Sequence, residues 1–367
     1  MYYKATADKE FFAENASLKQ EFERVLSVMV TSRQKPEVYL YPSNYLSDGL
    51  AYGDWHTGTN VCAWNALEAM SLLCEKVYHE TEKSSYYQSL ADKTKQDIER
   101  YCVMDGEFGK QYNEGVFVDG RETVPMSDGE ESDLTLIPFY GYARNDEITY
   151  QNFMKFAMTD KNIAYNPLLK CVKWGSDPYA YPDGIIATAP GYLKGIAAIT
   201  TSEQLLQKEG FMGNLRRVID ADGAIWWWPY NKEEYETPQR GIIGKSCWAS
   251  GVFAITFINR FLGLTFDANE RKLTIAPLAI KEYSWNDARF GNSVFDISYS
   301  EKVTAIKNKN SDEIKVTLQL PLQHGHRTIL INGKVTDQTN HLRYFDQPHV
   351  ELTVRVGASE SVTITQQ

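Results

Sequence analysis

Cysteine is scarce in this sequence, and no two cysteines stand in a Cys-x-x-Cys spacing. Their number is odd and most fall inside apolar runs of helical spacing, so we expect reduced thiols in a hydrophobic core rather than disulfides or metal ligands. The five are Cys62, Cys74, Cys102, Cys171 and Cys247. No other motif points to a metal or an organic cofactor, so we predict that the protein uses none.

Long apolar runs and an excess of basic residues are also missing. No apolar run reaches the ~18 residues of a membrane-spanning helix, so we expect no membrane partner. A formal net charge of −10, without a basic stripe or arm, argues against a nucleic-acid partner. The first ten residues lack the regions of a signal peptide, which leaves the compartment open. As it stands the chain is cytoplasmic, and it is periplasmic or secreted if an export signal has been removed.

Aromatic residues, in contrast, are plentiful. The 367 residues include 23 Tyr, 16 Phe and 8 Trp, and every Trp lies at or before Trp285. Flat apolar faces that carry one polar atom suit a sugar-binding cleft, although they also fill cores. With 43% hydrophobic residues, the chain is long enough for one large domain or two ordinary ones.

Two kinds of helix alternate along the first two thirds of the chain. Helices that are apolar on nearly all sides are predicted for residues 60–77, 134–143, 189–199 and 246–262. Amphipathic or charged helices are predicted for residues 11–31, 84–102, 146–158 and 203–219. Helices of the first kind must be packed on all sides, whereas the second kind keep a face in water. Hairpins of this type satisfy burial by closing into an α/α toroid; a linear solenoid is the competing arrangement, but no fixed repeat period is present.

Long segments precede the apolar helices. They cover residues 48–59, 104–133, 160–188 and 220–245, and all exceed the ~2–8 residues of an ordinary helix connection. Because the inner helices of a toroid run in one direction, these segments share one end of the ring. We therefore expect their carboxylates and indoles to line a common basin.

One of these segments carries an unusual density of acids. Asp128, Glu130, Glu131 and Asp133 fall within six residues and lead directly into an apolar run. At the N-terminus of a buried helix, unpaired backbone N–H groups and the helix dipole favour anions. The simpler interpretation, in which Ser132 or Asp133 is an N-cap and the remainder is solvated loop, explains at most one acid out of four.

After Gly263 the pattern changes to short alternating strands. They are expected at residues 272–276, 293–300, 302–306, 313–320, 327–331, 350–356 and 361–365. Turn signals such as Asn332-Gly333 separate them, which is typical of an antiparallel β-sandwich. We therefore predict a mainly α protein with two domains, an α/α toroid over residues 1–264 and a β-sandwich over residues 265–367. The only Trp of the second domain is near its start, which favours a structural cap over a sugar-binding module.

Five short sequences carry a resemblance to a known group of enzymes. They are Gly53-Asp54-Trp55, the acidic stretch 128–133, the aromatic run 226–230, Gly244–Trp248, and the passage from Phe261 to Pro277. With the hairpins and the terminal strands, the chain resembles the six-hairpin glycosidases, closest in style to α-L-rhamnosidase-like and glucoamylase-like hydrolases. The resemblance implies a toroidal catalytic domain that cleaves an α-linked glycoside or oligosaccharide.

The ring implied by this resemblance is short. A complete ring has twelve helices, whereas about eight to nine are predicted before Gly263. In rhamnosidase-like members the general acid precedes the position that matches Gly53-Asp54-Trp55, which would place it before residue 1. Either the acid lies elsewhere, or the chain is a fragment, a shortened ring, or a subunit that a homo-oligomer or a partner chain completes.

Glycoside cleavage needs a proton donor for the leaving oxygen and a second carboxylate. The six-hairpin enzymes are mostly inverting, which requires ~6.5–9.5 Å between the two carboxyl groups and so favours acids from two different loops. We predict Glu131 as the acid, with crowding by Glu130 and Asp133 and partial burial raising its pKa. Glu236 is the predicted base with Glu234 as its substitute, and Asp133 is a further catalytic candidate.

Other side chains at the predicted basin suit substrate binding. They are Asp54, Trp55, His56, Trp174, Asp183, Trp227, Tyr230 and Lys245. Asp54 would bond sugar hydroxyls, with an N-cap of the helix at Asn60 as its alternative role. Trp55 would stack on a sugar ring, and His56 would hydrogen-bond rather than bind a metal or act as a base.

Three other functions compete with hydrolysis. A glycoside phosphorylase would need an anion site, for which Lys245 is the candidate, although Lys245 could instead hold a carboxylate in place or contact a uronic acid. A polysaccharide lyase is disfavoured because the basin is acidic and would repel a uronate. A non-catalytic sugar-binding protein fits the short ring, and Glu131→Gln would distinguish it from an enzyme by abolishing turnover but not binding.

Overall fold

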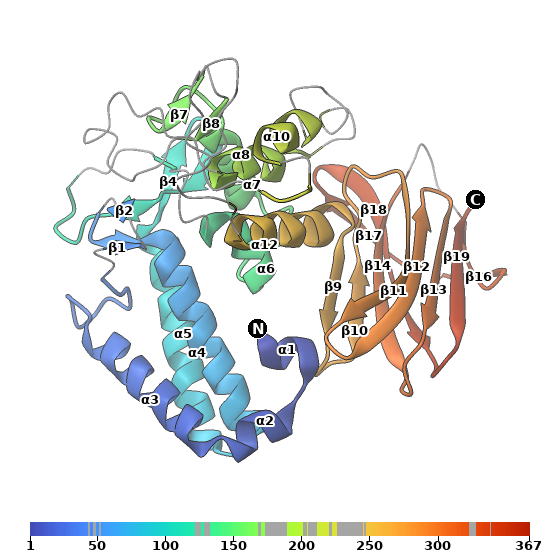
Figure 1. Ribbon diagram of the computed structural model, residues 1–367, viewed down its shortest axis with the longest axis horizontal. Helices are drawn as coiled ribbons and strands as arrows, with labels where there is room; N and C mark the ends of the chain where they lie inside the picture. The colour runs from blue at the N-terminus through green and yellow to red at the C-terminus, as the bar shows by residue number, and fades with distance from the viewer. Residues whose placement is uncertain are drawn as a thin grey trace. The chain divides into compact units, whose positions relative to one another are not determined.

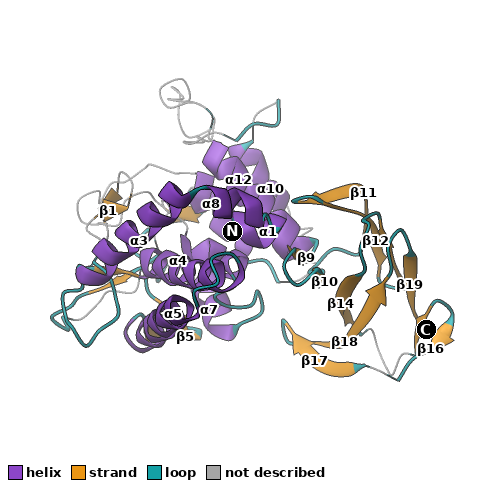
Figure 2. Ribbon diagram, turned by 90° about the horizontal axis from the view of Figure 1, so that it is seen from below, coloured by secondary structure: helices purple, strands orange, loops and turns teal. Residues whose placement is uncertain are grey.

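The computed structural model describes residues 1–42, 45–46, 49–50, 53–121, 126–127, 133–167, 170–172, 189–200, 204, 211–219, 222–225, 245, 247–322, 328–337 and 339–367 (Figure 1). Two compact units make up the chain. The β unit comprises Met1–Asp8, Thr200–Leu205 and Ile255–Gln367, and the helical unit comprises Lys9–Ile199 and Leu206–Ala254. Figure 2 shows helices predominating in one unit and strands in the other.

Helices dominate the described part of the helical unit. They are α2 (Lys9–Glu14), α3 (Ala16–Thr31), α4 (Thr57–Lys76), α5 (Thr81–Tyr101), the 3-10 helix η1 (Asp133–Leu136), α6 (Ile137–Tyr140), α7 (Ile148–Ala157), α8 (Ala189–Ala197), α10 (Phe211–Val218) and α12 (Cys247–Thr256), whose last two residues fall in the β unit. Each of the eight predicted helices has at least one helical counterpart among the described residues. The part of the chain that the structure describes contains no helix long and apolar enough to cross a membrane.

The predicted contrast between neighbouring helices is confirmed for α4 and α5, which lie side by side (Figure 1). In α4 only Ala66 and Glu75 are exposed, because apolar and small residues occupy all of its sides. In α5 the buried residues form one stripe at helical spacing, and the other faces carry charged residues. The stripe consists of Tyr87, Leu90, Ala91, Thr94 and Ile98. A helix buried on nearly all sides and a half-exposed one therefore pack together as a hairpin.

Two predicted helices are interrupted. The helix expected over residues 11–31 is divided at Asn15 into α2 and α3. The helix expected over residues 134–143 is a turn of 3-10 helix followed by the four residues of α6, because Gly141 adopts a left-handed conformation with φ of 76° and ends it. The apolar run is buried as predicted, but it is compact rather than extended.

Four two-stranded sheets lie in the segments between these helices. They are β1 (Tyr45–Leu46) with β2 (Gly49–Leu50), β3 (Trp55–His56) with β6 (Gly115–Val116), β4 (Val103–Gly106) with β5 (Gly109–Tyr112), and β7 (Tyr165–Asn166) with β8 (Cys171–Val172). All four pairs are antiparallel. The long segments are therefore folded back on themselves or onto one another.

The β unit contains two larger sheets and two short helical segments. One sheet has the order β17 (Asn340–Tyr344), β18 (Gln347–Val356), β14 (Ile314–Pro321), β10 (Lys272–Ile275) and β9 (Leu264–Asp267). The other has the order β11 (Glu282–Phe290), β12 (Ser293–Ser300), β13 (Val303–Asn308), β19 (Ser361–Gln366), β15 (Ile329–Ile331) and β16 (Lys334–Val335). The helical segments are α1 (Tyr2–Thr6) and the π-helical turn η2 (Phe257–Phe261).

Side chains from both sheets share one hydrophobic core, with Leu318 of β14 and Phe295 of β12 among its fully buried members. The pairing is mostly antiparallel, and the exception is β10, which runs parallel to β14. The sequence pattern predicted antiparallel strands throughout, and strands β9, β11, β16 and β17 were not predicted from it. In β11 a bulge between Trp285 and Ala288 breaks the alternation that marks a strand.

The cysteines are free thiols, as predicted. Cys74, Cys102 and Cys171 are buried, Cys62 is half-buried and Cys247 is exposed. Burial raises the pKa of the Cys102 thiol to about 12, so this side chain is an inert core residue.

Candidate active site

The segment before α4 is held against the segment that follows β5. Gly53 has φ of 99°, and a Cβ there would lie 2.7 Å from the Val116 backbone nitrogen, so only glycine fits. The Asp54 N–H donates to the Val116 carbonyl, and its carboxylate Oδ2 accepts from the Val118 N–H, both at 2.9 Å. Asp54 is thus fixed by a loop. Its alternative role as the N-cap of the following helix is wrong.

His56 is the residue that caps α4. Its Nδ1 accepts a hydrogen bond from the Thr59 N–H at 3.1 Å, which leaves the ring proton on Nε2. Nε2 lies 3.1 Å from Oε1 of Glu114 and donates to it. Both side chains are 1% exposed. The predicted hydrogen-bonding character of His56 is confirmed, but its observed partners belong to the protein.

Lys194 reaches the same carboxylate from α8. Its Nζ donates to the Ser127 hydroxyl at 2.7 Å and lies 3.8 Å from Oε2 of Glu114. The side chain is completely buried, with the Phe153 ring 5.8 Å away. A lysine that is buried in this way must be paired, because an isolated buried charge is strongly disfavoured.

We call His56, Glu114, Ser127 and Lys194 the buried charge cluster. The neutral imidazole and the lysine each contact one oxygen of the carboxylate, so the two formal charges offset each other. The three ionisable side chains are almost completely shielded from water, so none of them is placed to touch a substrate. The cluster joins the segment before α4, the segment after β5, and α8.

The cluster also fixes the start of the acidic stretch. The Ser127 N–H donates to Oδ1 of Asn162 at 3.1 Å, and Nδ2 of Asn162 donates to the Ser127 carbonyl at 2.7 Å. One residue earlier, the Met126 N–H donates to Oδ1 of Asn113 at 2.9 Å. With the Lys194 bond, Ser127 is therefore held by its backbone and its side chain, immediately before Asp128.

The end of the acidic stretch is equally well held. Leu134 is fully buried, and the Tyr150 hydroxyl donates to the Thr135 carbonyl at 2.9 Å. Further on, the Tyr142 hydroxyl donates to Glu99 at 2.7 Å, and burial raises the pKa of this phenol, so it remains a donor. Ser127 and the residues of η1 and α6, the described neighbours of positions 128–132, are thus held by buried contacts.

Two of the predicted substrate-binding residues contact other groups of the protein. Trp55 is 2% exposed and packs against Tyr101 with ring centres 5.8 Å apart, so its indole belongs to the core and offers no face to a sugar ring. Lys245 is exposed and forms an ion pair with Asp222, whose pKa it lowers. An anion bound by Lys245 would have to compete with this carboxylate.

The remaining predicted site residues lie outside the described part of the chain. These are Glu131, Glu234 and Glu236 among the catalytic candidates, and Trp174, Asp183, Trp227 and Tyr230 among the binding candidates. Asp133 opens η1, but its side chain is outside the described set as well.

Glu114 and Lys194 were missed by the sequence analysis. Lys194 is the one charged residue in the apolar run 189–199. A lysine in such a run is seldom fully buried unless it is paired, so it could have been singled out. Glu114 stands in a polar loop and gives no such signal. Among the residues that the structure describes, no group of His, Cys, Asp and Glu could hold a metal ion.

Comparison with known proteins gives a result only at the level of structure. No family model and no curated protein matches the chain. An α-L-rhamnosidase from Dictyoglumus thermophilum matches with a TM-score of 0.52 and 12% identity over 99% of this chain and 38% of that one. A metal-independent α-mannosidase of Streptococcus pneumoniae, solved with α-1,6-mannobiose, matches with a TM-score of 0.50 and 14% identity.

The chain has a six-hairpin glycosidase-like fold. The mannosidase match covers 65% of this chain and 61% of that one, so the chain spans less than two thirds of either structure. The six-hairpin resemblance read from the sequence is confirmed at the level of the fold. Within it, the described segments before α4 and after β5 meet helix α8 at the buried charge cluster.

Proposed function

We propose that the chain carries the catalytic site of a glycoside hydrolase that cleaves an α-linked glycoside or oligosaccharide with inversion. One observation carries the proposal. Ser127, the residue before the acidic stretch, bonds to Lys194, and Lys194 and His56 both contact Glu114, so that described segments far apart in sequence are joined at one place. A glycosidase needs such an arrangement, because its two carboxylates come from different loops and must keep a fixed separation.

The proposed reaction uses two carboxyl groups. Glu131, protonated, gives its proton to the glycosidic oxygen as the bond to the anomeric carbon breaks. Glu236, ionised, takes a proton from a water molecule that attacks this carbon from the opposite face. The separation required is ~6.5–9.5 Å. Asp133 and Glu234 are the alternative candidates for the two roles.

Binding would involve the remaining residues of the basin. Asp54 would bond a sugar hydroxyl while its Oδ2 remains bonded to Val118. Trp174, Asp183, Trp227 and Tyr230 would complete the subsite with aromatic faces and one further carboxylate. We assign the buried charge cluster to positioning, because its burial keeps it from the substrate.

The architecture proposed around this site is an α/α toroid over residues 1–264 followed by a β-sandwich over residues 265–367. The burial of α4 on nearly all sides and the single buried stripe of α5 support the inner and outer layers of such a ring. A measured mass in solution would report whether a homo-oligomer or a partner chain completes it.

A panel of aryl glycosides tests the function, with NMR of the first-formed anomer as the readout of inversion. Glu131→Gln should lower the rate by about 10²–10⁴-fold, the usual contribution of a general acid, while leaving sugar binding intact. Glu130→Gln, one residue away with the same change of charge, is the matched control. Greater loss in the control would overturn the assignment of Glu131. Binding of sugars without any release by the unmodified protein would favour the non-catalytic alternative.

A further inference from the structure

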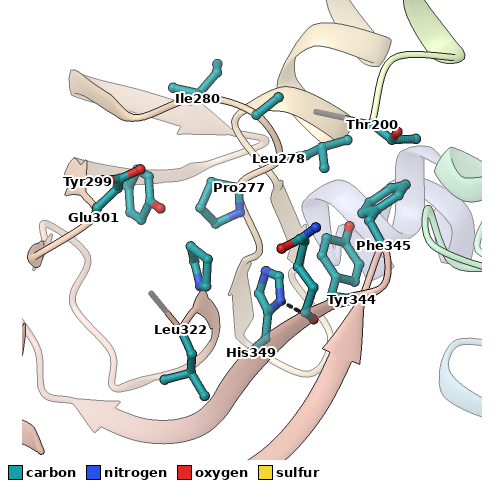
Figure 3. Close-up of a pocket in the computed structure, with 13 residues that line it drawn as sticks. Thr200, Pro277, Leu278, Ile280, Tyr299, Glu301, Leu322, Tyr344, Phe345 and His349 are labelled. Carbon is teal, nitrogen blue, oxygen red and sulfur yellow. Dashed lines mark hydrogen bonds between the residues drawn. The ribbon is translucent and has the colours of Figure 1, made fainter. Parts of the chain in front are cut away.

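A cavity of about 310 Å³ lies in the β unit. Its walls come from both sheets of that unit: Tyr299 and Glu301 at the end of β12, Pro321 and Leu322 at the end of β14, and the hairpin of β17 and β18 (Figure 3). The segment 277–280 completes it. This volume is at the lower end of the range for small-molecule sites, about 300–1,000 Å³, and suits a ligand of one or two small rings.

Strained backbone holds part of the wall in place. Phe345 and Asp346 have φ of 49° and 58° and form the two-residue turn between β17 and β18. Such turns favour Asn and Gly, and a bulky side chain with positive φ is an outlier. Ala279, on the opposing segment, also has a positive φ, 63°. Outliers that persist on two walls of one cavity point to a use for its shape.

The side chains of the wall combine flat apolar faces with polar groups. Tyr344, Phe345 and Pro277 provide the apolar surfaces, and Gln347 and His349 provide polar ones (Figure 3). Nδ1 of His349 donates to the Gln347 carbonyl at 3.0 Å, and its ring packs edge-on against Tyr344 with centres 5.3 Å apart. The orientation of the imidazole is therefore fixed before any ligand arrives.

The charges of the wall exclude some ligands. The described residues that line the cavity include Glu301 but no Lys or Arg. Phosphates, sulfates and uronates are therefore disfavoured, because anion sites require cationic donors. A quaternary ammonium would find aromatic rings and one carboxylate, but the amide and imidazole groups would have no role with such a ligand.

We propose that this cavity is a binding site for a neutral pyranose sugar, separate from the proposed catalytic site. An aromatic or proline face would pack against the apolar face of the ring, and Glu301, Gln347 and His349 would bond its hydroxyls. This reverses the expectation that the strand domain is only a structural cap. The proposal does not rest on catalysis, since the site would bind sugar in an inactive protein as well.

Phe345→Asn is the decisive variant, because asparagine suits the turn and should keep the fold while removing the ring. Ligand-observed NMR and calorimetry on the full chain would use methyl glucopyranoside, galactopyranoside and mannopyranoside as probes, with inorganic phosphate and choline as charged comparisons. We expect saturable binding of at least one pyranoside, weakened about tenfold by Phe345→Asn, as for the loss of a buried aromatic contact. Glu301→Gln should weaken it less, and Val335→Ala on exposed β16 should not change it.

Several results would overturn the proposal. One is an absence of saturable pyranoside binding, and another is binding that Phe345→Asn and Glu301→Gln both leave unchanged, which would place the sugar elsewhere on the chain. Preferential binding of choline or phosphate would assign the cavity to a charged ligand. Failure of the proposed hydrolase would appear separately, as pyranoside binding that responds to Phe345→Asn in a protein without turnover.

Discussion

The two units bury polar groups in different ways. The helical unit encloses the opposite charges of Glu114 and Lys194, and His56 contacts the other oxygen of the same carboxylate. The β unit, apart from Arg260 in η2, encloses neutral groups such as Asn308, whose Nδ2 donates to the carbonyls of Asp312, Val356 and Gly357. An amide bonded to backbone is tolerated at little cost, whereas buried charges are stabilised only by one another. Both units have an apolar core, but the helical unit also depends on a specific buried charge pair, whereas the described polar groups buried in the β unit are mostly neutral.

Lys194→Met tests this dependence most severely. Removing the cation leaves Glu114 buried without its charge partner, which should lower the free energy of unfolding by about 3–5 kcal/mol. Denaturant unfolding measures it, with Lys155→Met on the exposed side of α7 as the control. Adding Glu114→Gln should recover much of the loss, because the uncompensated charge is then gone. Equal, small effects at both lysines would contradict the role of the cluster.

Leu318→Ala makes the corresponding change in the β unit. Leu318 is fully buried in β14, so its truncation should cost about 2–5 kcal/mol, depending on how far the cavity collapses. The same unfolding experiment applies, with Val335→Ala at an exposed position as the reference. In contrast to Lys194→Met, no second polar substitution should restore stability here, because the loss comes from packing and not from an unpaired charge. A rescue of this kind would contradict the proposed difference between the two units.

Gly53→Ala examines the loop that carries Asp54. A positive φ costs a non-glycine residue about 1–2 kcal/mol, and here the new Cβ would also meet the Val116 backbone. Gly120 has φ of 76° with open space around it, so Gly120→Ala carries the conformational cost alone. We expect the larger loss of stability at Gly53, by thermal unfolding. If the two variants lose the same amount, the close approach of the segments is not required.

The smallest expected effect is a difference in reactivity between two cysteine thiols. Cys102 in the core should resist alkylation at mildly alkaline pH, whereas exposed Cys247 should react, as peptide mass spectrometry would show. Because the folded pKa of Cys102 is raised, its contribution to stability is lost as pH rises from the ordinary thiol range towards about 12. Early modification of Cys102 would indicate that the helical unit opens locally.

The sequence predicted elements better than it predicted contacts. Strands β12 and β14 follow strict alternation, and α4 and α5 follow helical periods, so local pattern suffices for them. Strand β11 was not predicted, because Asp287, with φ of 54° at its bulge, shifts the alternation by one position. The apolar run at residues 134–143 could equally have formed a long helix, and the left-handed Gly141 decided otherwise.

The site was predictable only in part for the same reason. Asp54 and His56 were singled out by their place before an inner helix, and both are tied into the loop structure there. The pairing of Glu114 with Lys194 joins residues far apart in the chain, and no local pattern encodes such a contact. Trp55 was predicted to stack on a sugar ring but is buried. The sequence could not decide between the two, because an aromatic residue beside a loop can face the core or the solvent with the same local pattern.

The first eight residues belong to the β unit. The Ala268 N–H donates to the Lys4 carbonyl at 2.8 Å, and Asn269 bonds to Tyr3. A ribosome therefore releases this segment long before the strands that receive it, with the whole helical unit synthesised in between. During synthesis α1 therefore emerges before β9 and the residues that bond to it, so its docking must follow the synthesis of the helical unit.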